Sequence, residues 1–256
     1  MTAKKHIICL DAGHWHGIDT PGKRSPDGTL LEYEFNRDVA NRIEDILARH
    51  DVEVLTCYDN TDTPLERRCA MANLFKADYF VSIHANAYKE NWNDANGWEI
   101  YIVSKGGKAE KLAEKIHKYS KELGLKDRGI KIGNFQVLRD TNMPAVLIEH
   151  GFYTNKEECE KLKSVSFRQK CAECDAKGIL EQLGIEYKET VKECDKLVLK
   201  INEKWYTING VKKEMEVPPR IENGRTLVTV APLRELGLTV EWNGETQEVT
   251  ITKGGK

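Results

Sequence analysis

Residues 77–87 read Ala-Asp-Tyr-Phe-Val-Ser-Ile-His-Ala-Asn-Ala. The apolar run Tyr79–Ile83 has the length and the aromatic and β-branched content of a buried strand, and His84 follows where that strand ends. Near-continuous apolar strands of this kind are typical of parallel sheets that are covered by helices. The segment therefore predicts an α/β sheet with a histidine at its rim.

Strands and helices alternate on both sides of this segment. Predicted strands cover residues 6–10, 52–56, 79–83, 98–103, 135–138 and 145–148. Predicted helices cover residues 32–49, 108–123, 155–163 and 167–183, and Thr63-Pro64 opens a further one. The alternation predicts an α/β fold over residues 1–187, with a mostly parallel sheet and helices on both faces.

The pattern changes after Tyr187. Residues 188–196 are charged and lack periodicity, which is typical of a linker. Residues 197–256 contain short alternating segments separated by Asn-Gly pairs, which favour hairpin turns. This region is predicted to be a small, β-rich C-terminal domain, near the lower size limit for independent folding.

Composition excludes several classes of protein. The net charge of -2 gives no sign of nucleic-acid binding. No apolar segment reaches the roughly 20 residues of a membrane span, and residues 1–10 do not resemble a signal peptide. The odd number of cysteines, 7, argues against a disulfide framework. We expect a protein that is cytoplasmic on synthesis and binds neither nucleic acid nor membrane.

Polar side chains follow three of the predicted strands. His14, His84 and Glu149 each come just after an apolar run, and functional groups of α/β sheets gather at the carboxyl ends of the strands. Glu32 begins the first long helix, close behind the loop of His14, although Glu34 is a rival for the same role. Two histidines and one carboxylate leave an open position on zinc, which is the pattern of a catalytic site.

These residues lie in segments that match one known family in order. The segments are LDAGHWHG (10–17), LEYEFNRDVANRI (31–43), RRCAMAN (67–73), ADYFVSIHANA (77–87), GWEIYIV (97–103) and MPAVLIEHGFYTN (143–155). Residues 5–183 thus resemble the zinc N-acetylmuramoyl-L-alanine amidases of the type-3 fold. The resemblance implies a peptidoglycan hydrolase in which a zinc-activated water cleaves the amide between N-acetylmuramic acid and L-alanine.

The resemblance also implies roles for particular residues. The family's Zn²⁺ ligands and its catalytic acid/base match His14, Glu32, His84 and Glu149, in that order. The family usually has glycine directly after its first metal histidine, whereas Trp15-His16-Gly17 follows here, so His16 is a rival ligand. Arg68 and Asn86 lie near the same rim in the family pattern, where they either orient substrate or hold the loops.

The C-terminal region resembles a second family. The motifs at 217–219, 223–228, 233–237, 240–242 and 249–251 are similar to the copper amine oxidase-like N-terminal (stalk) module. That module carries no copper chemistry, and residues 197–256 contain no histidine. The resemblance implies binding to the bacterial cell wall. Self-association through the module is the alternative that the sequence leaves open, and the oligomeric state remains undecided.

The lack of a recognisable signal peptide favours a phage endolysin, which acts at the cell wall after release from the cytoplasm, over an exported bacterial autolysin. The alternative setting is a bacterial enzyme involved in sporulation or mother-cell lysis. Two other functions remain as alternatives: a zinc peptidase acting on wall peptides, and a catalytically inactive cell-wall-binding protein. The donor set would also accept other divalent metals.

Overall fold

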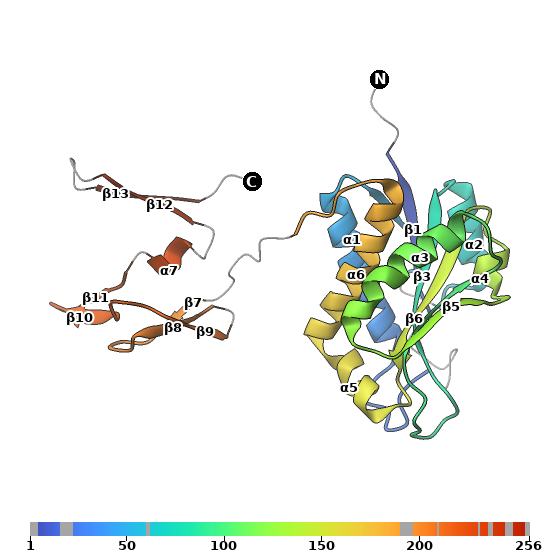
Figure 1. Cartoon of the computed structure of the whole chain (residues 1–256), viewed down its shortest axis with the longest axis horizontal. Coiled ribbons are helices and arrows are strands. Elements are labelled where there is room, and N and C mark those ends of the chain that lie inside the picture. The colour runs from blue at the N-terminus through green and yellow to red at the C-terminus, as the bar shows by residue number, and fades with distance from the viewer. Residues whose placement is uncertain are drawn as a thin grey trace. The chain divides into compact units, whose positions relative to one another are not determined.

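The computed structural model describes residues 5–15, 23–59, 62–189, 197–208, 210–229, 231–234, 238–243 and 248–253. The chain divides into two compact units, Met1–Lys188 and Glu189–Lys256 (Figure 1). Most of the predicted linker, 188–196, lies outside the described residues.

The N-terminal unit is built on a six-stranded sheet in the order β2-β1-β3-β6-β4-β5. Its strands are β1 (Ile7–Ala12), β2 (Glu53–Thr56), β3 (Tyr79–Asn86), β4 (Trp98–Ile102), β5 (Asp127–Ile132) and β6 (Ala145–Phe152). Strands β2, β1, β3 and β6 are parallel, β4 is antiparallel to β6, and β5 is parallel to β4. The expected α/β class with a mostly parallel sheet is confirmed.

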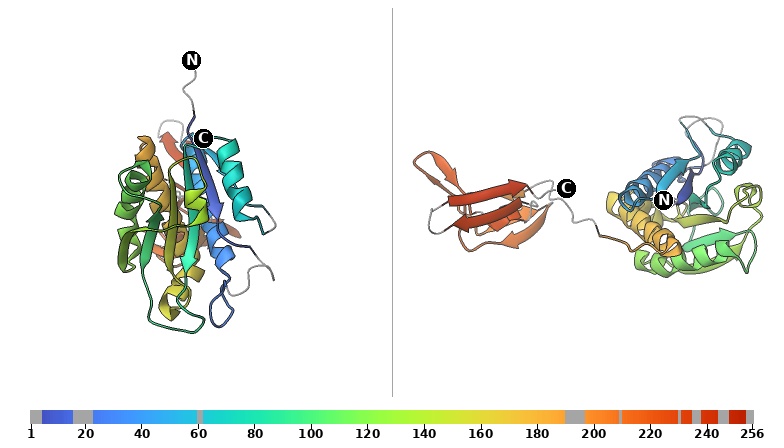
Figure 2. Two further views of the ribbon diagram at one scale, coloured as in Figure 1. Left: turned by 90° about the vertical axis from the view of Figure 1, so that its right-hand side faces the viewer. Right: turned by 90° about the horizontal axis from the view of Figure 1, so that it is seen from above.

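Helices cover both faces of this sheet. They are α1 (Glu32–Arg49), α2 (Leu65–Leu74), α3 (Lys108–Ser120, continued by the 3-10 turn Lys121–Leu123), α4 (Gln136–Arg139), α5 (Lys156–Lys163) and α6 (Val165–Leu183). Apolar residues of α1, α3 and α6 share one core cluster, and those of α2 and α4 share another. Figure 2 shows α3 and α6 on one side of the sheet and α2 on the other.

The apolar periodicity of α1 explains its placement. Phe35, Val39, Ile43 and Ile46 recur at helical spacing and are all buried. Each such side chain contributes roughly 1.5–3 kcal/mol on burial. Packing this face onto the sheet fixes the start of the helix, and with it Glu32, beside the strand ends.

One predicted strand is wrong and one strand was missed. The segment predicted as a strand at 135–138 is instead part of the short helix α4, since a four-residue apolar run has no period that separates the two states. Strand β5 escaped prediction because it is a half-buried, mostly polar strand interrupted by Gly129, whose φ is 75°.

Among its described residues, the C-terminal unit contains short antiparallel strands and one helical turn. They are a three-stranded sheet of β7 (Leu197–Leu199), β8 (Trp205–Ile208) and β9 (Val211–Glu214), the pairs β10 (Arg220–Glu222) with β11 (Arg225–Leu227) and β12 (Leu238–Asn243) with β13 (Glu248–Lys253), and the helical turn α7 (Ala231–Arg234). The positive φ angles of Asn223 (50°) and Gly224 (74°) suit the tight turn between β10 and β11. The expected small β-rich region is confirmed.

Across the described parts of both units, no helix combines the length and apolar content needed to cross a membrane.

Candidate active site

Three strand ends bring the predicted site residues to one edge of the sheet. His14 follows β1, while His84 and Glu149 lie directly opposite each other in the parallel pair β3–β6. The register of that pair shifts between His84 and Asn86. Such bulges re-aim side chains and are common beside active sites.

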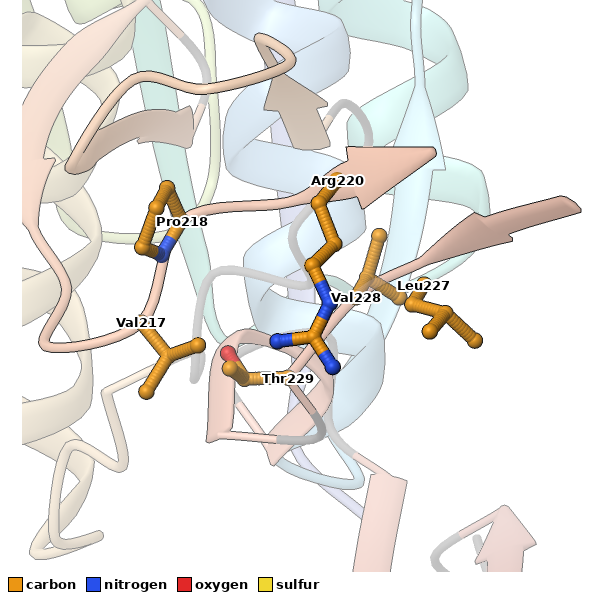
Figure 3. A pocket seen from close by; sticks show the side chains of 6 residues that line it. All are labelled: Val217, Pro218, Arg220, Leu227, Val228 and Thr229. Carbon is orange, nitrogen blue, oxygen red and sulfur yellow. The ribbon is translucent and has the colours of Figure 1, made fainter. Parts of the chain in front are cut away.

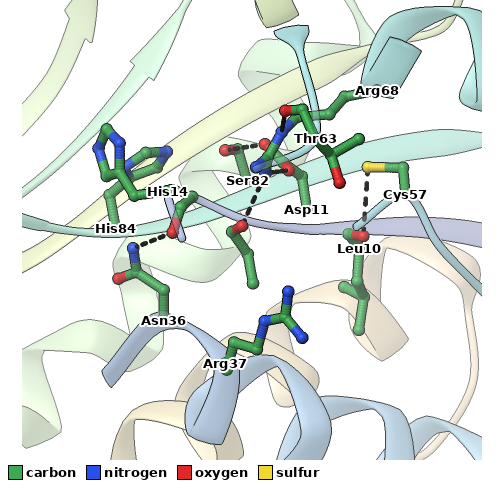
Figure 4. Close-up of polar contacts among 12 residues, drawn as sticks. Leu10, Asp11, His14, Asn36, Arg37, Cys57, Thr63, Arg68, Ser82 and His84 are labelled. Carbon is green, nitrogen blue, oxygen red and sulfur yellow. Dashed lines mark hydrogen bonds and ion pairs between the residues drawn. The ribbon is translucent and has the colours of Figure 1, made fainter. Parts of the chain in front are cut away.

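His14, Glu32 and His84 converge on one point. Their candidate ligand atoms all lie within 4.8 Å of one another. Oε1 of Glu32 is 3.0 Å from Nδ1 of His84 and 3.5 Å from Nε2 of His14. The two imidazole rings are nearly perpendicular, with centroids 5.0 Å apart, and they lie next to each other in Figure 4.

The electrostatics of His14 and Glu32 suit a cation. Burial lowers the pKa of His14 to about 4, against the attraction of Glu32, so its imidazole is neutral at pH 7. Burial opposes ionisation of Glu32, but the hydrogen bond from His84 and the electrostatic interactions with His14 and His84 outweigh it and lower the pKa of its carboxyl. A neutral imidazole and an ionised carboxylate are the protonation forms that bind metals. At His84, burial lowers the pKa of the imidazole, but the hydrogen bond and the charge of Glu32 outweigh burial and raise it.

Asn36 supports this cluster and was not predicted. Its amide donates to the backbone oxygen of Gly13, at 2.9 Å, and to Oε1 of Glu32, at 3.3 Å. The i, i+4 spacing of Glu32 and Asn36 on a predicted helix was the available signal. His14 itself has a φ of 61°. This backbone conformation is strained for a residue other than glycine, and such strained residues cluster at functional sites.

A buried ion pair holds the end of β1. The Arg68 guanidinium binds the carboxylate of Asp11, and it also donates to the backbone oxygen of Ala12 at 2.7 Å. Ser82 of β3 donates to the other oxygen of Asp11 at 2.7 Å, and Figure 4 shows this group beside the histidines. Of the two roles left open for Arg68, the contacts therefore favour scaffold: it fixes the strand end that carries His14.

Glu149 lies beside this cluster, opposite His84 in the sheet. The residue is half-buried, and its Oε2 is a buried atom that makes no hydrogen bond within the described structure. Burial raises the pKa of its carboxyl to about 8, and the nearby charges of Glu32 and Glu99 act in the same direction. A carboxyl with such a pKa can accept and release a proton near neutral pH.

Glu99 is a second residue that the sequence did not single out. It lies opposite Glu149 in the antiparallel pair β4–β6 and is buried. Asn86, which the family pattern places near this rim together with Arg68, donates a hydrogen bond to Glu99 at 2.9 Å. This contact holds the Asn86 side chain against the sheet. A charged residue inside the apolar run Trp98–Ile102 was the signal for a special site.

Of the remaining candidates, Glu34 and His150 lie outside the cluster. Glu34, the rival of Glu32, is exposed. His16, the rival of His14, lies outside the described residues. His150 is buried behind the site, where its Nε2 is 2.8 Å from the Asp175 carboxylate and its Nδ1 is 3.2 Å from the backbone oxygen of His84.

An α/β sheet that carries a His–Glu–His cluster beside an unpaired carboxylate is typical of metal-dependent hydrolases. Residues 8–181 match the family model described as N-acetylmuramoyl-L-alanine amidase, and residues 185–251 match the copper amine oxidase N-terminal domain. The chain belongs to the N-acetylmuramoyl-L-alanine amidase family. The expected family and the expected peptidoglycan amidase activity are thereby confirmed.

Individual relatives agree with this membership. The endolysin of Bacillus phage SPP1 is 36% identical over 191 residues, a match covering 71% of this chain and 68% of the relative. The amidase CwlM of Bacillus licheniformis is 37% identical, over 70% of this chain and 69% of its own length. The solved catalytic domain of CwlV, an amidase from Bacillus (Paenibacillus) polymyxa, is 36% identical, with a TM-score of 0.65 over 71% of this chain and 99% of that domain.

The C-terminal unit has a small cavity of its own, of about 160 Å³ (Figure 3). Its lining is mainly apolar with one guanidinium and consists of Val217, Pro218, Arg220, Leu227, Val228 and Thr229. Arg220 is paired there with Glu222 at 3.2 Å.

Proposed function

We propose that this amidase is zinc-dependent, that His14, Glu32 and His84 hold the metal, and that Glu149 is its catalytic acid/base. The observation that carries the proposal is the convergence of three donor atoms within 4.8 Å of one another, next to the carboxyl of Glu149, whose buried Oε2 makes no hydrogen bond among the described residues. The donor set of two imidazoles and one carboxylate fits zinc and leaves a coordination position for water.

A zinc ion bound there would polarise water and lower its pKa toward about 7. Glu149 accepts the proton of the attacking water on its carboxylate. It then returns that proton to the nitrogen of the departing L-alanine, so that the amide yields a free carboxylic acid and a free amine. Asn36 holds the Glu32 carboxylate and the Gly13 carbonyl in place during this cycle.

Metal analysis tests the ligand assignment. His84→Ala is expected to lose both bound zinc and amidase activity, because one of three protein donors is gone. His6→Ala, at an exposed histidine outside the cluster, serves as the matched control and should keep one zinc per chain. Full zinc occupancy in His84→Ala would contradict the assignment.

Product analysis separates this function from a zinc peptidase. An amidase exposes new N-terminal alanine and leaves the glycan strands and the remaining peptide bonds intact. Release of other N-terminal residues from purified wall would instead identify a peptidase that uses the same metal site.

The biological setting proposed here is that of a phage endolysin, cytoplasmic on synthesis and acting at the wall after release. Support comes from the similarity to the SPP1 endolysin. Expression in a bacterial host should leave cells intact until the membrane is permeabilised, after which turbidity should fall. Lysis without permeabilisation would favour an exported autolysin.

We further propose residues 188–196 as a linker and residues 197–256 as a wall-binding domain. The compact unit Glu189–Lys256 and the family match at 185–251 support this division. A fluorescent fusion of residues 188–256 should co-sediment with purified walls. A fusion that stays in solution and doubles its mass in light scattering would favour self-association.

A further inference from the structure

A row of polar residues begins at the proposed zinc ligand His84 and crosses the sheet toward β5. His84 of β3 lies opposite Glu149 of β6, and Glu149 lies opposite Glu99 of β4. Directly opposed residues of an antiparallel pair, such as Glu149 and Glu99, have Cβ atoms about 4.5–5.5 Å apart. Two cations of the neighbouring strand β5, Arg128 and Lys131, both bind Oε2 of Glu99 and extend the row.

The Glu99 carboxylate is saturated by these partners. Besides the two cations on Oε2, Oε1 accepts hydrogen bonds from Tyr101 at 2.6 Å and from Asn86 at 2.9 Å. The Glu99 side chain is only 2% exposed. One buried carboxylate thus faces two cations. Arg128 also interacts with the buried carboxyl of Glu158, so Lys131 is the cation whose charge is shared least with other acidic groups.

Both cations are fixed in place but remain accessible. The side chains of Arg128 and Lys131 are 30% and 34% exposed. The guanidinium of Arg128 also donates to the backbone oxygen of Asn96 at 3.3 Å and lies 5.0 Å from the ring centroid of Phe152. Pre-organised, half-exposed cations can bind an anion at a small cost in conformational entropy.

Resting on the proposed function, we propose that Lys131, together with Arg128, forms a subsite for a carboxylate on the peptide of the substrate. N-acetylated sugars and the scissile amide carry no charge, so carboxylates of a muramyl peptide occur only in its peptide. A subsite one strand beyond Glu99 would receive that peptide while the scissile amide lies at Glu149. Lys131 is then a specificity-determining residue.

The test compares muramyl tripeptides that differ in a single carboxylate. One pair carries D-glutamate or its α-amide, D-isoglutamine, at the second peptide position. The other pair carries free or amidated diaminopimelate at the third. Wild type should cleave the free acid of one pair with a higher kcat/KM, and Lys131→Gln should lower that acid-to-amide ratio about tenfold, as expected for loss of one charge-assisted hydrogen bond.

Two further variants separate charge recognition from a structural effect. Lys131→Glu should invert the preference, which a loss of stability would not do. Lys170→Gln, at an exposed lysine of α6, should keep the wild-type ratio. An unchanged ratio in Lys131→Gln for both pairs would overturn the subsite while leaving the amidase intact. If wild type cleaves none of the four substrates, the amidase function is overturned, and the subsite with it.

Discussion

A Cβ atom on Gly13 would lie only 2.0 Å from Cε1 of His84. Real Cβ atoms do not approach other heavy atoms so closely, so the His84 ring occupies space that only glycine leaves free. The backbone of the β1 end is therefore part of the wall against which a proposed zinc ligand is held.

Gly13→Ala is expected to displace His84 and weaken zinc binding by about 10–100-fold, the range typical of lost support for a metal ligand. Zinc affinity, measured by competition with a chelating dye, checks this. Gly107→Ala is the matched control, because a Cβ there meets no atom within 4 Å. Equal affinities for the two variants would show that His84 has room to move.

Arg68→Met is expected to destabilise the fold by about 3–5 kcal/mol, because it leaves the buried Asp11 carboxylate without its cation. Chemical denaturation measures the free energy of unfolding. The exposed pair Arg139–Asp140 provides the control, since Arg139→Met should change stability by less than about 1 kcal/mol. Similar effects at both sites would argue against a structural role for Arg68.

The buried pair His150–Asp175 should show energetic coupling. Both side chains are 0% exposed, so removing either one leaves the other without its partner in an apolar core. We expect Asp175→Leu and His150→Leu to destabilise separately, and the double variant to recover about 1–3 kcal/mol relative to their sum. Simple additivity in a double-mutant cycle would mean that the two groups do not interact.

The stability of the fold at low pH should depend on the hydrogen bonds of Asp27 in the turn before α1. Hydrogen bonds from the hydroxyl of Ser25 and from Thr29 lower the pKa of Asp27 from 3.8 to about 2. Because the pKa is lower in the folded state, this stabilisation is present above about pH 4 and is lost as the pH falls toward 2. Asp27→Asn should therefore lower Tm at pH 7 relative to wild type, with the difference vanishing near pH 2.

The exposed Asp45→Asn controls for loss of one negative charge. A Tm difference for Asp27→Asn that is the same at pH 7 and pH 2 would show that the ionised form of Asp27 does not brace the turn.

The sequence predicted the sheet edge well, because parallel strands end at a common edge and His84 and Glu149 each follow an apolar run. The sequence could not predict side-chain contacts that depend on strand register or on helix docking. Glu99 meets Lys131 only because β4 and β5 pair side by side, and Asp175 reaches His150 only through the docking of α6. The error at 135–138 arose because tertiary packing, rather than local pattern, decides the state of so short a run.

The central claim is that Glu149 moves the proton while other residues hold the metal. Purified cell wall should be digested with wild type and with Glu149→Gln, and the new N-terminal alanine and the bound zinc should be measured in parallel. We expect full zinc occupancy in both proteins and a loss of alanine release in the variant of about 10²–10⁴-fold. Wild-type release of alanine by Glu149→Gln would contradict the account.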